Sequence, residues 1–339
     1  YVGTFLLMFL AGLANAGGLG GGALLTPILL IFFNYDPNKA IMIVYSIVFG
    51  GSLGNFFNVA LKKNPATGKS FVDFDLSLIC MPLMVAGANV GVLLNHVFPP
   101  IIVLIGLIGT MVYTGKKVYA KAQKTYEAES NARKEPFLEK NSSPEPKRTS
   151  KENLELTVLD KSAGLSSIDQ ANQTNTPEEK NELQVILEED KQLFPPAKLK
   201  IIGALLAFTV LTMIVKGSKS ADSLIGVEYC QTGYWIVFIL GMDGSYGFYR
   251  KGVQEVEKRL EDKRRHNYNF EGDAFSLTPE IIKSITLLSI VTGIAAGLLG
   301  IGGGMVMSPS LLQFGMAPQP LAATAGFFVV QTSFVTLFQ

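Results

Sequence analysis

Charged side chains are scarce in this sequence. Asp, Glu, Lys and Arg make up only 17% of its 339 residues, whereas a soluble domain carries about 25%. Half of that charge lies in one stretch, because residues 116–200 hold fifteen of the 29 Lys and Arg and fifteen of the 28 Asp and Glu. The remainder is apolar enough to indicate an integral, multi-pass membrane protein with one hydrophilic insertion.

Cysteine and histidine are also rare, with two of each. Two cysteines are too few for a disulfide framework, and neither Cys nor His shows the spacing of metal ligands. The net charge of +1 leaves no dominant basic face for nucleic acid. No nucleophile–base pair or paired carboxylates stand out, so we expect neither an enzyme nor a cofactor.

Glycine, by contrast, is abundant and is arranged in an internal repeat. Residues 14–32 align with residues 296–314 at an offset of 282, and nine of the nineteen pairs are identical. Each copy places a glycine cluster inside an apolar run of membrane-spanning length. Because glycine weakens a helix interior by about 1 kcal/mol per residue, each cluster is predicted to break its helix into two half-helices.

The apolar runs predict an all-α fold, a multipass transmembrane helical bundle with an internal repeat and glycine-broken helices. Glycine interrupts the first and seventh of eight expected spans, which cover residues 2–33, 40–61, 76–95, 101–115, 199–215, 233–249, 279–314 and 321–338. In the third span, the Gly87-x-x-x-Gly91 spacing favours close helix packing. Lys and Arg gather in the loops that follow the second, fourth and sixth spans. The positive-inside rule therefore places these loops in the cytosol.

The repeat divides the chain into a first transmembrane unit, an insertion, two linking helices, a cytosolic loop with a short amphipathic helix, and a second transmembrane unit. Their expected bounds are 1–115, 116–198, 199–250, 251–279 and 280–339. The insertion is expected to be largely disordered, with short helices at its two ends, because it has no apolar period. Gln339 matches about Asn58 of the first unit, so the second unit is expected to be truncated.

Three interpretations of the glycine clusters compete. Gly18 to Ala23 fits G-x-G-x-x-A formally, but a dinucleotide site needs a soluble strand–turn–helix unit, and the second copy has Met305 in place of the final Ala. Close helix packing is the plainer alternative, although three adjacent glycines exceed what one helix face needs. We favour a transport site, since broken helices at membrane depth line cavities and their exposed N–H groups bind anions.

The transport hypothesis assigns substrate binding to both copies and to polar residues beside them. These residues are Asn15, Gly17, Gly18, Gly20, Gly21, Gly22, Thr26, Gly300, Gly302, Gly303, Gly304, Ser308 and Gln331. For Asn15 and Gln331, an interhelical hydrogen bond is an equal alternative to substrate binding.

Asp243 is a carboxylate well inside an apolar segment, a setting in which ionisable residues often relay protons. It is therefore a candidate for proton coupling. The alternative is that the span breaks at Gly241 to Gly244 and that Asp243 caps a half-helix in a wet pocket.

The glycine motif followed by a hydroxyl–proline pair resembles the sulfite exporter TauE/SafE family. Its eukaryotic, plant-like branch is also matched by Asp36-Pro37, by Asp73 to Leu76, and by Val227 to Cys230. The resemblance implies a membrane transporter of small anions, such as sulfite, sulfonates or related sulfur-containing organic anions. From the two glycine-broken helices we expect alternating access at a site between them, and Asp243 makes protons a further candidate partner.

A rival hypothesis from another functional class remains open. In it, the protein is a non-transporting membrane subunit or scaffold, and residues 116–198 dock cytosolic protein partners.

Overall fold

The computed structural model describes residues 2–16, 20–63, 68–141, 188–189, 192–217, 223–224, 226–228, 230–266 and 277–337. Ten helices and no β-strand are found in these ranges. Six helices are long and apolar enough to cross a membrane, which confirms the all-α, multipass prediction. In the first part of the chain the helices are α1 (Val2–Ala16), α2 (Gly22–Phe32), α3 (Pro37–Ala60), α4 (Phe74–Val97) and α5 (Pro100–Asn141). After the insertion come α8 (Pro196–Lys216), α9 (Thr232–Arg265), α10 (Pro279–Leu299), α11 (Gly304–Gln313) and α12 (Pro318–Leu337).

Both glycine clusters break their helices, as predicted. α1 ends at Ala16 and α2 begins at Gly22, while α10 ends at Leu299 and α11 begins at Gly304. The backbone at Gly20, Gly21, Gly300 and Gly302 has φ of 78°, 74°, 71° and 70°. Residues with a Cβ rarely adopt this left-handed conformation, so the glycines determine where the breaks fall.

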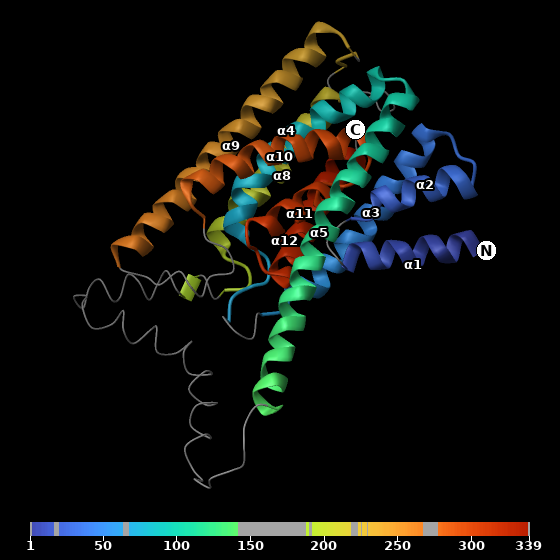
Figure 1. The fold of residues 1–339 in the computed structure, drawn as a ribbon. Coiled ribbons are helices and arrows are strands. Elements are labelled where there is room, and N and C mark those ends of the chain that lie inside the picture. Colours follow the sequence, from blue (N-terminus) through green and yellow to red (C-terminus); the bar gives the residue numbers. More distant parts are fainter. Residues whose placement is uncertain are drawn as a thin grey trace.

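α4 lies at the centre of the bundle and packs against α10, α9, α12 and α8 (Figure 1). Its contact with α10 is made by glycine from both sides. A Cβ on Gly87 would lie 3.0 Å from the Cα of Gly293, and one on Gly91 would lie 3.0 Å from the Cα of Gly297. The predicted packing role of Gly87 and Gly91 is therefore confirmed, and Gly293-x-x-x-Gly297 is its partner.

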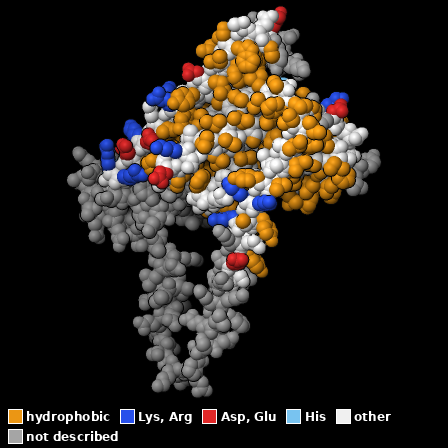
Figure 2. Space-filling view, turned by 45° about the horizontal axis from the view of Figure 1, so that its top comes forward, with side chains coloured by type: hydrophobic (Ala, Val, Ile, Leu, Met, Phe, Trp, Pro, Cys, Tyr) orange, Lys and Arg blue, Asp and Glu red, His pale blue; other side chains and the backbone are white. Residues whose placement is uncertain are grey.

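The outer surface is broadly apolar. Figure 2 shows hydrophobic side chains over most of one face, with charged side chains gathered at its margins. Exposed side chains include Phe5, Ile31, Ile105 and Leu240, at 74%, 76%, 64% and 61% of their full surface. Such an area of apolar surface suits contact with lipid and confirms an integral membrane protein.

Two predicted boundaries were wrong. The fourth span was expected to end at Gly115, but α5 continues to Asn141, because the Ala, Lys, Glu and Gln residues that follow favour helix without being apolar. Residues 142–187 of the insertion lie outside the described residues. The sixth span was expected to be separate from a short surface helix, but α9 is one helix of 34 residues and is not among the six candidate spans.

The alternative of a break at Gly241 to Gly244 is also wrong, because α9 runs through it without interruption. Gly244 instead makes room for the ring of Phe208 on α8, whose Cε1 would lie 2.6 Å from a Cβ at that position. The Ser245 hydroxyl donates to the carbonyl of Gly241 at 2.9 Å, one turn back in the same helix. Gly244 therefore serves the packing of α8 against α9.

Candidate functional site

The two glycine breaks, far apart in sequence, lie directly against each other. A Cβ on Gly22 would overlap the carbonyl oxygen of Gly300 and would lie 2.8 Å from the Cα of Ile301. A Cβ on Gly302 would lie 3.9 Å from the Cα of Gly20. The backbones of the two copies thus approach as closely as only glycine allows.

Two valines at matching positions cover the breaks reciprocally. Val48 is eleven residues after the start of α3, and Val329 is eleven residues after the start of α12. A Cβ on Gly20 would lie 2.9 Å from Val329 Cγ1, and one on Gly302 would lie 3.6 Å from Val48 Cγ1. Each unit therefore supplies a valine to the break of the other, as expected for halves related by a pseudo-two-fold axis.

At the start of each second half-helix, some N–H groups already have a hydrogen-bond partner within the protein. In α2, the N–H groups of Leu24 and Leu25 both donate to the carbonyl of Gly21 at 3.0 Å. At the start of α11, the N–H of Gly303 donates to the hydroxyl of Thr332 on α12 at 3.2 Å. α12 is therefore tied to the second break by a hydrogen bond, and one N–H at that end is already occupied.

Three of the residues assigned to substrate binding carry buried polar atoms that have no hydrogen-bond partner among the described residues. These atoms are Oδ1 of Asn15, Oγ of Ser308, and both Nε2 and Oε1 of Gln331. Their residues are 5%, 5% and 3% exposed. Because buried polar groups are nearly always hydrogen-bonded, such atoms call for an explanation, such as a ligand or water. Thr26, the counterpart of Ser308, donates to the carbonyl of Gly22 at 2.8 Å instead.

The other residues assigned to substrate binding or proton coupling fall into three groups: those that form the breaks, those outside the described residues, and one that lies away from the breaks. Gly20, Gly21, Gly22, Gly300, Gly302, Gly303 and Gly304 form the two breaks. Gly17 and Gly18 lie outside the described residues. Asp243 is exposed on α9, which packs against α4 and α8, so the structure does not bring it to the breaks.

An open groove of about 810 Å³ lies between α1 and α3. Asn15, Asn55 and Asn58 line it together with apolar side chains of both helices. The Asn55 side chain donates to the carbonyl of Asn15 at 2.8 Å, and the Asn15 side chain donates to the carbonyl of Ala11 at 2.9 Å. The Asn55 carboxamide therefore holds the end of α1 against α3, while Asn15 Oδ1 has no partner among the described residues.

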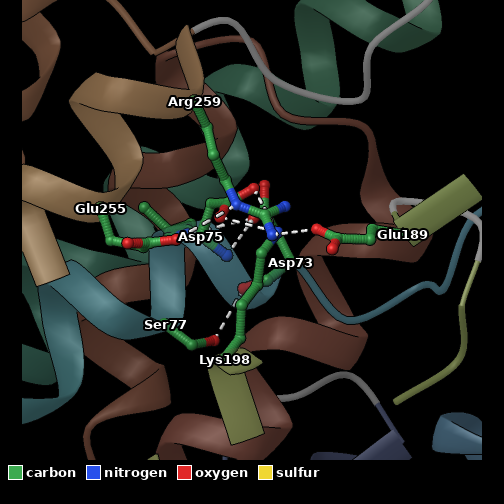
Figure 3. Close-up of polar contacts among 8 residues, drawn as sticks. Asp73, Asp75, Ser77, Glu189, Lys198, Glu255 and Arg259 are labelled. Atoms are coloured by element: carbon green, nitrogen blue, oxygen red, sulfur yellow. Dashed lines mark hydrogen bonds and ion pairs between the residues drawn. The ribbon is translucent and has the colours of Figure 1, made fainter. Parts of the chain in front are cut away.

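An ionic cluster that the sequence analysis missed lies at the start of α4 (Figure 3). Lys198, at the start of α8, is buried and its Nζ lies 2.7 Å and 2.8 Å from the two carboxylate oxygens of Asp75. Asp73 caps α4 by accepting the N–H groups of Asp75 and Leu76 at 3.0 Å. The cluster joins α4 to α8, and only the burial of Lys198 within the fold could have revealed this pairing.

The same cluster reaches α12 and contains a perturbed acid. The backbone N–H of Asp73 donates to the hydroxyl of Thr324 on α12 at 2.9 Å. Burial, together with the nearby charge of Asp75, raises the pKa of Asp73 to about 6, against the opposing influence of Lys198 and the capping N–H groups. Arg259 of α9 pairs with Glu189 and Glu255 beside it (Figure 3).

Within the ranges that the structure describes, no group of three or more His, Cys, Asp or Glu side chains could hold a metal ion.

The sequence is similar to one protein-family model and to several curated plant proteins. The model of the family "Sulfite exporter TauE/SafE" matches residues 2–149. "Sulfite exporter TauE/SafE family protein 5" of Arabidopsis thaliana is 28% identical over 328 residues, which cover 95% of this chain and 66% of the relative. "Sulfite exporter TauE/SafE family protein 3" of the same plant is 26% identical over 339 residues, which cover 100% of this chain and 65% of the relative.

This chain thus spans slightly less than two thirds of the length of those two curated relatives. No solved structure matches it. The matching glycine breaks, the apolar helices and the similarity over nearly the whole chain confirm the resemblance inferred from sequence: this multipass membrane protein is similar to proteins of the sulfite exporter TauE/SafE family.

Proposed function

We propose that the protein transports small anions across a membrane, with the substrate bound where the two glycine breaks meet. The observation that carries this proposal is the contact of Gly22 with Gly300 and Ile301. It is supported by the buried polar atoms of Ser308 on α11 and Gln331 on α12, which have no protein partner among the described residues. Repeated transporters place their substrate between broken helices of this kind.

The chemistry of the region favours an anion of modest charge. Two helix N-termini lie close together there, and each carries the positive end of a helix dipole. The carboxamide of Gln331 and the hydroxyl of Ser308 add donors without adding a fixed charge. An oxyanion such as sulfite or a sulfonate would gain hydrogen bonds here, and it could still leave because neither copy of the repeat, residues 14–32 or 296–314, contains Lys or Arg.

Alternating access follows from the way the breaks are held. Each break touches a valine of the other unit, and Gly303 is tied to Thr332 on α12. A relative movement of the two units would change both sets of contacts together, and we propose that this movement opens the site to each side of the membrane in turn.

The decisive experiment is anion flux through the natural full-length protein in liposomes, with sulfite, sulfate and sulfonates offered in turn. Gly22→Ala should abolish flux, because its Cβ has no space beside Gly300. Gly109→Ala on α5 is the matched control, since a Cβ there meets nothing within 4 Å. Both variants must first be shown to insert and to elute as monodisperse protein.

Flux of none of these anions by the natural protein would contradict the proposed function. Normal flux by folded Gly22→Ala would leave transport standing but would remove the breaks as its site.

A further inference from the structure

The groove between α1 and α3 has a counterpart on the other side of the bundle. The repeat relates α1 to α10 at an offset of 282 residues and α3 to α12 at an offset of 281, since α2 is one residue longer than α11. The surface of α10 and α12 that corresponds to the groove is not open, because α4 packs along both helices.

The α10 half of that surface consists of backbone and small residues that touch α4. A Cβ on Gly87 would lie 2.6 Å from the carbonyl oxygen of Ile290 and 2.9 Å from the amide of Ile294. Gly87 and Gly91 meet five α10 residues, and subtracting 282 from four of them gives groove-lining residues of α1, while the fifth, Leu298, corresponds to Ala16 outside the groove. The pairs are Ile290 with Met8, Gly293 with Ala11, Ile294 with Gly12, and Gly297 with Asn15.

The α12 half matches in the same way. Thr324 accepts the N–H of Asp73 at the start of α4, Phe328 shares a buried cluster with Met81 and Met84, and Val335 shares one with Val85 and Ala88. Subtracting 281 gives Ile43, Ile47 and Gly54 of α3, and all three line the groove.

Burial differs sharply between the paired helices. In α12, 78% of the residues in its most apolar stretch are buried, but in α3, the matching helix, only 33% are. α4 covers α12, whereas no helix among the described residues occupies the same place on α3. The groove between α1 and α3 therefore corresponds to a helix-binding surface that α4 occupies on α10 and α12.

We propose that the groove between α1 and α3 docks a membrane-spanning helix of the same polypeptide, the second unit's counterpart of α4. The curated relatives are longer than this chain and have room for such a helix. This proposal does not depend on what the protein transports.

The groove also sets the chemistry of its occupant. α4 approaches α10 through glycines four residues apart, so the docked helix needs small residues with the same spacing against Ala11 and Gly12. Asn15 stands where α10 has Gly297, and its Oδ1 lacks a partner in the groove wall. The docked helix should therefore bring a hydrogen-bond donor to this level.

The test compares the natural full-length polypeptide with a chain limited to residues 1–339, each reconstituted in liposomes. A nitroxide label is placed on Gly12→Cys or Gly54→Cys in the groove, and on Gly109→Cys of α5 as control. A Cβ at any of these positions meets nothing within 4 Å. Cys230 is replaced by Ser because it is exposed, while buried Cys80 can stay.

The expected result is a severalfold lower oxygen accessibility of both groove labels in the full-length protein than in the 1–339 chain, with no change at Gly109. Gly12→Trp should likewise lower the Tm of the full-length protein by several degrees and leave the Tm of the 1–339 chain unchanged. The control variant Gly109→Trp should leave the Tm of both proteins unchanged.

Three results would overturn the proposal. Equal, high accessibility in both proteins would show that the groove faces lipid or water. Low accessibility in both that increases on dilution would identify a second copy of the chain as the occupant. Protection that appears only when a sulfonate is added would make the groove a substrate cavity.

Discussion

Gln331 separates a transport role from a structural role most clearly, because the two predict opposite changes in stability. Both polar atoms of its carboxamide are buried on α12 and have no partner among the described residues. Gln331→Met keeps the length and approximate volume of the side chain and removes both polar atoms.

The expected gain in stability follows from the cost of those atoms. A buried polar group without a partner costs about 1–3 kcal/mol in a soluble protein, but polar interactions between membrane helices average only about 0.6 kcal/mol. For two atoms we therefore expect Gln331→Met to be more stable by about 1–2 kcal/mol, a rise in Tm of roughly 2–4 °C. Anion flux should fall at the same time, because a donor at the substrate site is gone.

The assay pairs thermal unfolding in detergent with flux per reconstituted molecule. Gln331→Glu is a useful companion, since it keeps the shape but adds a negative charge that should repel an anionic substrate. A lower Tm of Gln331→Met, with flux reduced only in proportion to folded protein, would refute the reasoning and assign the carboxamide to a structural hydrogen bond.

Two further predictions concern protons. The pKa of Asp73 is raised to about 6, so between pH 4 and 6 the folded protein holds more protons than the unfolded chain, and stability falls as pH rises through this range. Its partial exposure limits the loss to at most about 2 kcal/mol; Asp73→Asn, which keeps the helix cap, should flatten the pH dependence of Tm, and an unchanged slope would contradict this assignment. Asp243→Asn tests the proposed proton-coupling role of that residue: a transporter that uses it should lose the pH dependence of flux, and unaltered dependence would end the idea.

The breaks were predictable because glycine acts locally. Four glycines of the two clusters have a left-handed backbone conformation. A run of adjacent glycines predicts this conformation from the local sequence alone. The apolar runs likewise predict membrane helices, since about 20 consecutive apolar residues form a helix long enough to cross the hydrocarbon core of a bilayer.

The lengths of α5 and α9 were harder to predict. Hydropathy marks where apolar residues end, but a helix continues as long as its residues favour helix and no breaker intervenes. Gly241 and Gly244 resemble helix breakers in the sequence, and the Phe208 ring that packs against α9 explains Gly244, while nothing in the structure explains Gly241.

The sequence by itself determined the membrane class, the helical fold, the repeat and the two breaks, because composition, period and glycine chemistry act over short stretches of chain. Only the tertiary structure decided that Gly22 meets Gly300, that Lys198 pairs with Asp75, and that Gln331 is buried with no partner among the described residues. Those facts depend on which helices pack together. Contacts between segments hundreds of residues apart depend on how all the helices pack together. A local sequence pattern carries no information about that packing.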